Sequence, residues 1–206
     1  MMFSLDGKEL AVFKKLSSPI KIQDFLDSLP FNHERHGETH MSPRRVLRER
    51  KAHCIEGALF AATALWLYGE KPLIMDLAAQ RPDDDHVVAL YKRNGYWGAI
   101  SKTNHAVLRF RDPIYKTLRE LALSYFHEWF LDTNGKKTLR SYSTPLNLRT
   151  LGSKWISAEE ELWYIDTRLN ALPHIALIPR NNERSIRRAD NMEQKAGALV
   201  EWKNRT

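Results

Sequence analysis

The chain has 206 residues, of which 43% are hydrophobic and 28% charged, and its formal net charge is +7. These values favour one soluble domain, residues 1–206, with a sizeable hydrophobic core. The basic residues are scattered and carry no nucleic-acid-binding motif, which argues against a nucleic-acid partner. The first residues lack the order of a signal peptide, and the longest apolar run is too short to span a bilayer. We therefore expect a cytoplasmic protein that does not bind membranes.

Two short helices are predicted before residue 54. In SSPIKIQDFLDSLP, a serine at position 17 or 18 can cap the first helix and Pro19 suits its first turn. In SPRRVLRERK, Ser42 can cap the second helix and Pro43 suits its first turn. The polar segment FNHERHGETH between them contains Gly37 and is typical of a loop.

The only cysteine, Cys54, opens an almost wholly apolar run that ends near Gly69. Such a run predicts a helix buried in the core from Cys54 to Tyr68. A thiol at a helix N-terminus has a lowered pKa, and a neighbouring imidazolium lowers it further. We expect His53 to be a poor partner, because adjacent residues on a helix point in different directions.

Three strands follow the cysteine helix. PLIMDLAA predicts one strand, and HVVALYKR and YWGAIS predict a hairpin joined by Asn94-Gly95. A two-residue turn pairs Arg93 with Tyr96 and places His86 opposite Thr103. Because side chains alternate along a strand, His86, Ser101 and Thr103 then share one face of the sheet.

The second half of the chain predicts further elements. Residues 114–131 read as one long amphipathic helix, 134–148 as a loop or weak strand, and 157–172 as a helix whose capping box is Ser157 with Glu160. HIALIP (174–179) predicts a last strand, and a polar tail occupies about 180–206. Helices, then strands, then helices indicate an α+β fold.

Three features follow one another in this part of the chain. A cysteine opens a buried helix in AHCIEGALFAA, a histidine opens a strand in DHVVALY, and a turn-G-x-W hairpin occurs in NGYWGAIS. This arrangement resembles the core of the transglutaminase-like superfamily of papain-type cysteine enzymes, over roughly Ala52 to Ser101. The resemblance implies a papain-like core within about 42–131, with the nucleophile helix packed on an antiparallel sheet. It also implies Cys54 as the nucleophile and His86 as its base.

The family's third residue, usually Asp, falls on Ser101, which can accept a hydrogen bond but supplies no negative charge. Asn104 and Asp112 are alternatives for this place. Asp85, adjacent to His86, would point to the opposite face. The backbone N–H of Cys54 and a second donor would bind the oxyanion, and Asn32 is a candidate for that donor.

Two other patterns could be metal sites, but each is more typical of an ordinary polar loop. His33, His36 and His40 have a spacing that could ligate a metal, but Gly37 disfavours a continuous helix. RPDDDH lacks the glycine and distal glutamate of a calcium loop. We expect neither a metal nor another cofactor.

The sequence therefore predicts a cysteine enzyme that performs acyl transfer on an amide or peptide bond, as a peptidase, an amidase or a transamidase. The alternative is a catalytically degenerate member of the same fold that binds or regulates a partner. Its substrate would be a peptide or another molecule that bears an amide. The sequence indicates no oligomeric state.

Overall fold

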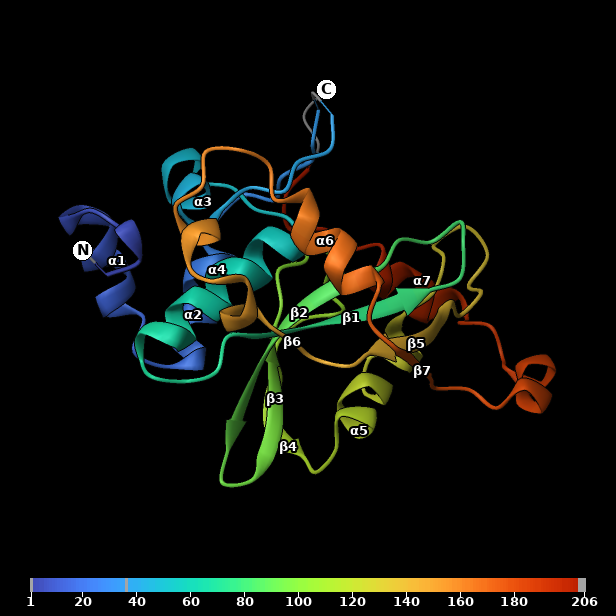
Figure 1. Cartoon of the computed structure of the whole chain (residues 1–206). Helices are drawn as coiled ribbons and strands as arrows, with labels where there is room; N and C mark the ends of the chain where they lie inside the picture. Colours follow the sequence, from blue (N-terminus) through green and yellow to red (C-terminus); the bar gives the residue numbers. More distant parts are fainter. Residues whose placement is uncertain (1, 36, 204–206) are drawn as a thin grey trace.

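The computed structural model describes residues 2–35 and 37–203. Helices come first along the chain, up to Leu67, and the first strand of the sheet begins at Leu73 (Figure 1). The α-helices are α1 (Gly7–Lys15), α2 (Pro19–Asp27), α3 (Pro43–Glu49), α4 (Cys54–Leu67), α5 (Leu118–Leu123), α6 (Trp163–Asn170) and α7 (Asn191–Gly197). The short 3₁₀ turns are η1 (Met2–Ser4), η2 (Phe126–Glu128), η3 (Leu148–Leu151), η4 (Lys154–Ile156) and η5 (Arg180–Ser185).

The predicted starts of α2 and α3 are confirmed. The hydroxyl of Ser18 accepts a hydrogen bond from the backbone N–H of Lys21, and that of Ser42 accepts one from Arg45. Helix α1 was not predicted, although Asp6 and Glu9 form a reciprocal capping box at its start. The signal for this helix was therefore present in the sequence.

A single antiparallel sheet runs through the fold, in the order β4-β3-β2-β1-β5-β7, with β6 also paired to β1. Its strands are β1 (Leu73–Ala79), β2 (His86–Arg93), β3 (Tyr96–Ile100), β4 (Arg111–Tyr115), β5 (Leu139–Ser143), β6 (Leu146–Asn147) and β7 (His174–Ala176). The predicted hairpin and its register are confirmed, because Arg93 pairs with Tyr96. Asn94 and Gly95 both have positive φ angles, as a tight hairpin turn with the right twist requires.

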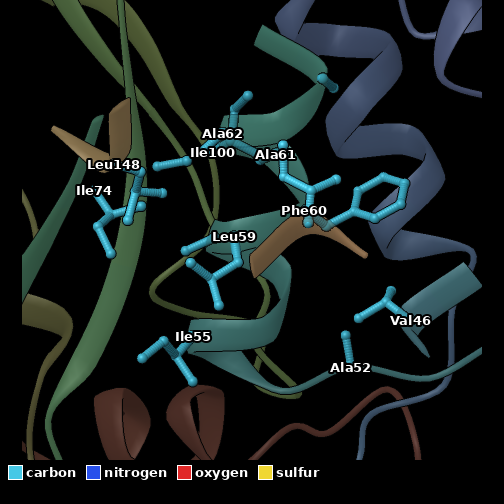
Figure 2. Packing of buried hydrophobic residues seen from close by; sticks show 14 of the residues in the cluster. Val46, Ala52, Ile55, Leu59, Phe60, Ala61, Ala62, Ile74, Ile100 and Leu148 are labelled. Atoms are coloured by element: carbon cyan, nitrogen blue, oxygen red, sulfur yellow. The ribbon is translucent and has the colours of Figure 1, made fainter. Parts of the chain in front are cut away.

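Alternate residues of the strands enter two separate cores. On one face, Ile74 and Ile100 pack with the buried helix α4, and Figure 2 shows them beside Leu59 with Val46 of α3 on the other side of that helix. On the opposite face, β1 to β3 pack against α5 and the aromatic residues that follow it, including Trp129. The mixed α+β class with a helix packed on an antiparallel sheet is therefore confirmed.

The predicted long helix over 114–131 is wrong. Residues 111–115 form edge strand β4, in which Tyr115 pairs with Trp97, and α5 covers only Leu118–Leu123. Thr117 caps α5 through a capping box with Glu120, so the helix starts after the strand. Pairing with β3 holds the start of this segment extended, although its sequence has the periodicity of a helix.

The predicted start of the helix over 157–172 is also wrong, since α6 begins at Trp163. Ser157 instead follows the 3₁₀ turn η4. The carboxylate of Glu161 pairs with Arg45 at 2.6 Å and accepts a hydrogen bond from the backbone N–H of His40. These contacts with the 40–45 segment fix 157–162 outside the helix.

The weak strand expected within 134–148 is present as β5 and β6, and the strand expected in HIALIP is β7. The tail contains η5 and α7, and its last residues, 204–206, lie outside the described residues. Within residues 2–35 and 37–203, no helix is both long and apolar enough to cross a membrane.

Candidate functional site around Cys54

Cys54, a half-buried residue, is the first residue of α4, and it lines a cavity of about 540 Å³. The N–H groups of the first helical turn have no partner within a helix, so this position offers a partial positive charge to an anion. Gly57, one turn later, allows a close approach to the chain beyond β3. A Cβ atom at Gly57 would lie 2.4 Å from Cβ of Lys102.

His53 lies directly beside the thiol, which corrects the expectation that it would point away. His53 is the N-cap residue and its backbone is extended, so the helical geometry that separates neighbouring side chains does not apply to it. Its Nδ1 atom lies 3.9 Å from Sγ of Cys54, and its Nε2 atom lies 2.7 Å from the carbonyl oxygen of Thr39. Because a carbonyl only accepts, Nε2 must carry a hydrogen, and Nδ1 is the nitrogen that can take the thiol proton.

Glu56 holds His53 in place from a fully buried position. Its carboxylate accepts hydrogen bonds from the backbone N–H of His53 at 2.9 Å, from that of Met41 at 3.1 Å and from the hydroxyl of Thr39 at 2.8 Å. One of its oxygens also lies 3.4 Å from Nε2 of His53. Burial alone would raise the pKa of Glu56, but the hydrogen bond and charge of His53 lower it. A carboxylate is therefore present near the thiol, on the side of His53.

His86 opens β2, as the sequence predicts, and its Nε2 atom lies 2.7 Å from the hydroxyl oxygen of Ser101. The Ser101 hydroxyl donates its hydrogen to the carbonyl of Leu108 at 2.6 Å, so it must accept one from Nε2 of His86. The indole of Trp129 packs edge-on against the imidazole at 6.0 Å between ring centroids. This contact and the hydrogen bond orient the ring, and they leave Nδ1 as the nitrogen available to the thiol.

The two imidazoles determine the ionisation of the thiol. Burial disfavours the thiolate, but hydrogen bonds and charges from His53 and His86 outweigh it and lower the pKa of Cys54 to about 5. Burial likewise opposes the charge on His53, while the hydrogen bonds to Cys54 and Glu56 raise its pKa to about 11. At neutral pH the pair is therefore a thiolate beside an imidazolium, which is the reactive form of a nucleophilic cysteine.

Two of the residues considered for the third catalytic position, Asn104 and Asp112, have no hydrogen bond to His86. The side-chain amide of Asn104 lines the cavity but is hydrogen-bonded in both directions to the backbone of Trp202, at 2.8 and 2.9 Å. Asp112 is an exposed residue of β4 and does not line the cavity. Ser101 is thus the one of the three candidates that contacts His86.

The structure does not favour Asn32 as an oxyanion donor. Its side-chain nitrogen donates to the hydroxyl of Thr39 at 2.8 Å and to the carboxylate of Glu56 at 3.2 Å, and it does not line the cavity around the thiol. Asn32 therefore belongs to the hydrogen-bond network that supports Glu56. The backbone N–H groups at the start of α4 remain as donors beside the thiol.

Asp76 is an acidic residue of the cavity that the sequence analysis missed. It lies on β1, is almost fully buried, and its carboxylate is 3.0 Å from Nε2 of His174. Burial is the largest cause that raises its pKa to about 6. A charged residue in the middle of the apolar strand PLIMDLAA was the available signal, because a buried carboxylate requires a partner.

The described parts of the chain contain no group of three or more histidine, cysteine or acidic residues that could hold a metal ion. His36 lies outside the described residues. His40 packs against Trp163 at 4.0 Å between ring centroids, and His33 packs against Phe31. The acidic loop after β1 uses Asp85 to accept a hydrogen bond from the backbone N–H of Ala79.

No protein-family model matches the chain, and a search of curated proteins also gives no match. What the site can do chemically is therefore argued from its own geometry.

Proposed function

We propose that the chain is a transglutaminase-like cysteine enzyme that transfers the acyl group of an amide or peptide bond through Cys54. One observation carries the proposal: a thiol at a helix N-terminus lies among two imidazoles, His53 and His86, each with a hydrogen on Nε2 that is already donated to an oxygen. In each ring, Nδ1 is therefore the nitrogen that these bonds leave free, and Nδ1 of His53 lies 3.9 Å from Sγ of Cys54. This is the arrangement that a nucleophilic cysteine requires.

In the first half of the reaction, the thiolate of Cys54 attacks the carbonyl carbon and forms a tetrahedral intermediate. The backbone N–H groups at the start of α4 stabilise the oxyanion. His86, which takes the proton that the thiol gives up, then passes it to the leaving nitrogen as the C–N bond breaks, and this leaves a thioester on Cys54. In the second half, water or an amine attacks the thioester, His86 takes its proton, and the C–S bond breaks.

The remaining polar residues support these steps. Ser101 fixes the Nε2–H of His86 but brings no charge, whereas Glu56 balances the charge of His53. In the family, a carboxylate usually contacts the catalytic histidine. Here the carboxylate of Glu56 lies next to His53, whereas His86 has the uncharged Ser101 as its partner. His53 stabilises the thiolate between turnovers, and His86 exchanges protons with the substrate.

The rate of Cys54 alkylation by iodoacetamide between pH 4 and 10 tests this proposal, since the chain has a single cysteine. We expect the wild type to react with an apparent pKa well below the ordinary value of about 8.5. His86→Ala and His53→Ala should each raise it. The control, His127→Ala, alters an exposed imidazole outside the cavity and should leave it unchanged.

Labelling that becomes fast only near pH 8.5, or only when the protein unfolds, would contradict the proposal. A non-catalytic protein of the same fold, with Cys54 as a packing residue, would then be the better interpretation. If the thiol is reactive, amide hydrolysis or transamidation should disappear in Cys54→Ala and persist in His127→Ala.

A further inference from the structure

The cavity around Cys54 is the middle one of three adjoining cavities. A larger cavity of about 1070 Å³ lies on one side and shares Phe31, Glu34 and Glu38 with it as walls. A smaller one of about 200 Å³ lies on the other side and shares Asp83, His105, Leu108 and Trp129. The central cavity is therefore continued at two different walls, and we call the three cavities together the Cys54 groove.

A groove that extends well beyond the cavity of the nucleophile suits an amide in the interior of a chain. A single drug-sized molecule fills about 300–1,000 Å³, and the cavity of about 1070 Å³ alone reaches the upper end of that range. A small amide would leave most of the groove empty, whereas an extended polypeptide would occupy it before and after the scissile bond.

The middle of the groove is acidic, although the whole chain has a net charge of +7. Among the described residues, seven carboxylates line the central cavity, from four parts of the chain. They are Glu34 and Glu38, Asp76 of β1, the loop 83–85, and Asp166 of α6.

Three positively charged side chains line the same cavity within the described part of the chain, namely Lys102, Arg81 and the imidazolium of His53. Lys102 is fully buried, and its ammonium donates to the carbonyls of Leu26 and Leu29 at the end of α2. The exposed Arg81 lies 3.5 Å from Asp84. The seven carboxylates therefore outnumber the three positive charges around the central cavity, and this excess of negative charge attracts positive ligands and repels negative ones.

We propose that the acyl donor of this site is a polypeptide segment with lysine or arginine side chains near the scissile amide, bound extended along the Cys54 groove. This inference rests on the proposed function for the reaction at Cys54. The extent of the groove is the reason for a long substrate, and the carboxylates around the thiol are the reason for basic side chains in it. The basic side chains would lie at the central cavity, beside Glu38 and the loop 83–85.

Two thiol reagents of similar size and opposite charge test the charge preference. We compare the labelling rates of Cys54 by trimethylammonioethyl methanethiosulfonate and by sulfonatoethyl methanethiosulfonate, each divided by its rate with 2-mercaptoethanol. The thiolate fraction cancels in the ratio of the two rates, so this measurement does not depend on the pKa of Cys54. At 20 mM salt we expect a normalised ratio of at least about tenfold in favour of the cation. It should fall toward one at 1 M salt, where the screening length is about 3 Å.

Matched charge variants locate the effect. The triple variant D83N/D84N/D85N should reduce the ratio severalfold. The double variant E38Q/D84N, which alters two exposed side chains, should do the same. The control D24N/E160Q/E183Q removes three exposed carboxylates that line none of the three cavities, and it should leave the ratio unchanged. A ratio near one in the wild type, or equal losses in the groove variant and the control, would overturn the charge preference.

Protection of Cys54 from iodoacetamide by blocked peptides tests the length. A ten-residue lysine-rich peptide should slow alkylation more than a glutamate-rich peptide of equal length, and more than N-acetyl-lysine amide. Equal protection by N-acetyl-lysine amide would overturn the extended mode, and better protection by the acidic peptide would overturn the charge preference. An unreactive thiol with an ordinary pKa would instead refute the proposed function itself, which the alkylation profile reports separately.

Discussion

Replacement of the buried carboxylate of Glu56 should affect both the stability of the fold and the reactivity of Cys54. Glu56 is inaccessible to solvent and accepts hydrogen bonds from His53, Met41 and Thr39 at 2.8 to 3.1 Å. Its Oε1 atom also lies 3.4 Å from Nε2 of His53. Glu56→Gln keeps the size and one accepting oxygen but removes the charge, so it isolates the electrostatic part of these interactions.

The expected loss follows from the number and kind of these contacts. A hydrogen bond to a charged group contributes about 1.5–3 kcal/mol, and a buried donor left without a partner costs about 1–3 kcal/mol. Breaking a buried ion pair costs about 3–5 kcal/mol. Because these contributions overlap and do not add, we expect Glu56→Gln to lower the free energy of unfolding by about 2–3 kcal/mol. Glu56→Ala should lower it by about 3–5 kcal/mol.

Urea unfolding at pH 7.5, followed by tryptophan fluorescence, measures the stability, and iodoacetamide labelling of the folded variant measures the thiol pKa. Without the carboxylate, the imidazolium of His53 is less favoured, so the pKa of Cys54 should rise. The control Glu49→Gln removes a partly exposed helical ion pair with Arg45 and should cost about 0.3–0.5 kcal/mol. A loss below about 1 kcal/mol in Glu56→Gln, or an unchanged thiol pKa, would refute the reasoning.

Two further substitutions test the positions of the helix and of Asp76. Gly57→Ala should lower the free energy of unfolding by about 1–3 kcal/mol and slow the alkylation of Cys54. The new Cβ atom would lie 2.4 Å from Cβ of Lys102 and displace the start of α4. A variant as stable in urea as the wild type would contradict this. Burial raises the pKa of Asp76 to about 6 from its ordinary 3.8, so the native state holds this proton more tightly than the unfolded chain does. The Asp76 contribution to stability should therefore fall as pH rises from about 4 to 6, and Asp76→Asn should remove that decline in urea titrations at pH 4, 5, 6 and 7. Parallel stability curves for wild type and variant would count against it.

The features that sequence determined are those with local causes. Ser18 and Ser42 cap helices through hydrogen bonds to residues three positions away, and Asn94-Gly95 forms a turn that both residues can adopt at positive φ. Once that turn is known, the alternation of side chains determines that His86 and Ser101 share a face. Their hydrogen bond of 2.7 Å could therefore be anticipated from counting residues.

Tertiary structure decided the features that depend on distant partners. Ile114 and Tyr115 belong to β4, which pairs with β3, instead of starting a helix. The contact of Glu161 with Arg45 holds residues 157–162 outside α6, so the predicted capping box of Ser157 with Glu160 does not start that helix. The position of His53 depends on the carbonyl of Thr39, which no local pattern places beside it. Sequence determined that Cys54 would open a helix and that His86 would open a strand and share a face with Ser101, because caps, turns and strand alternation act over a few residues. Only the folded chain decided that a second imidazole and a buried carboxylate join them, because the segments that hold these groups meet through long-range packing.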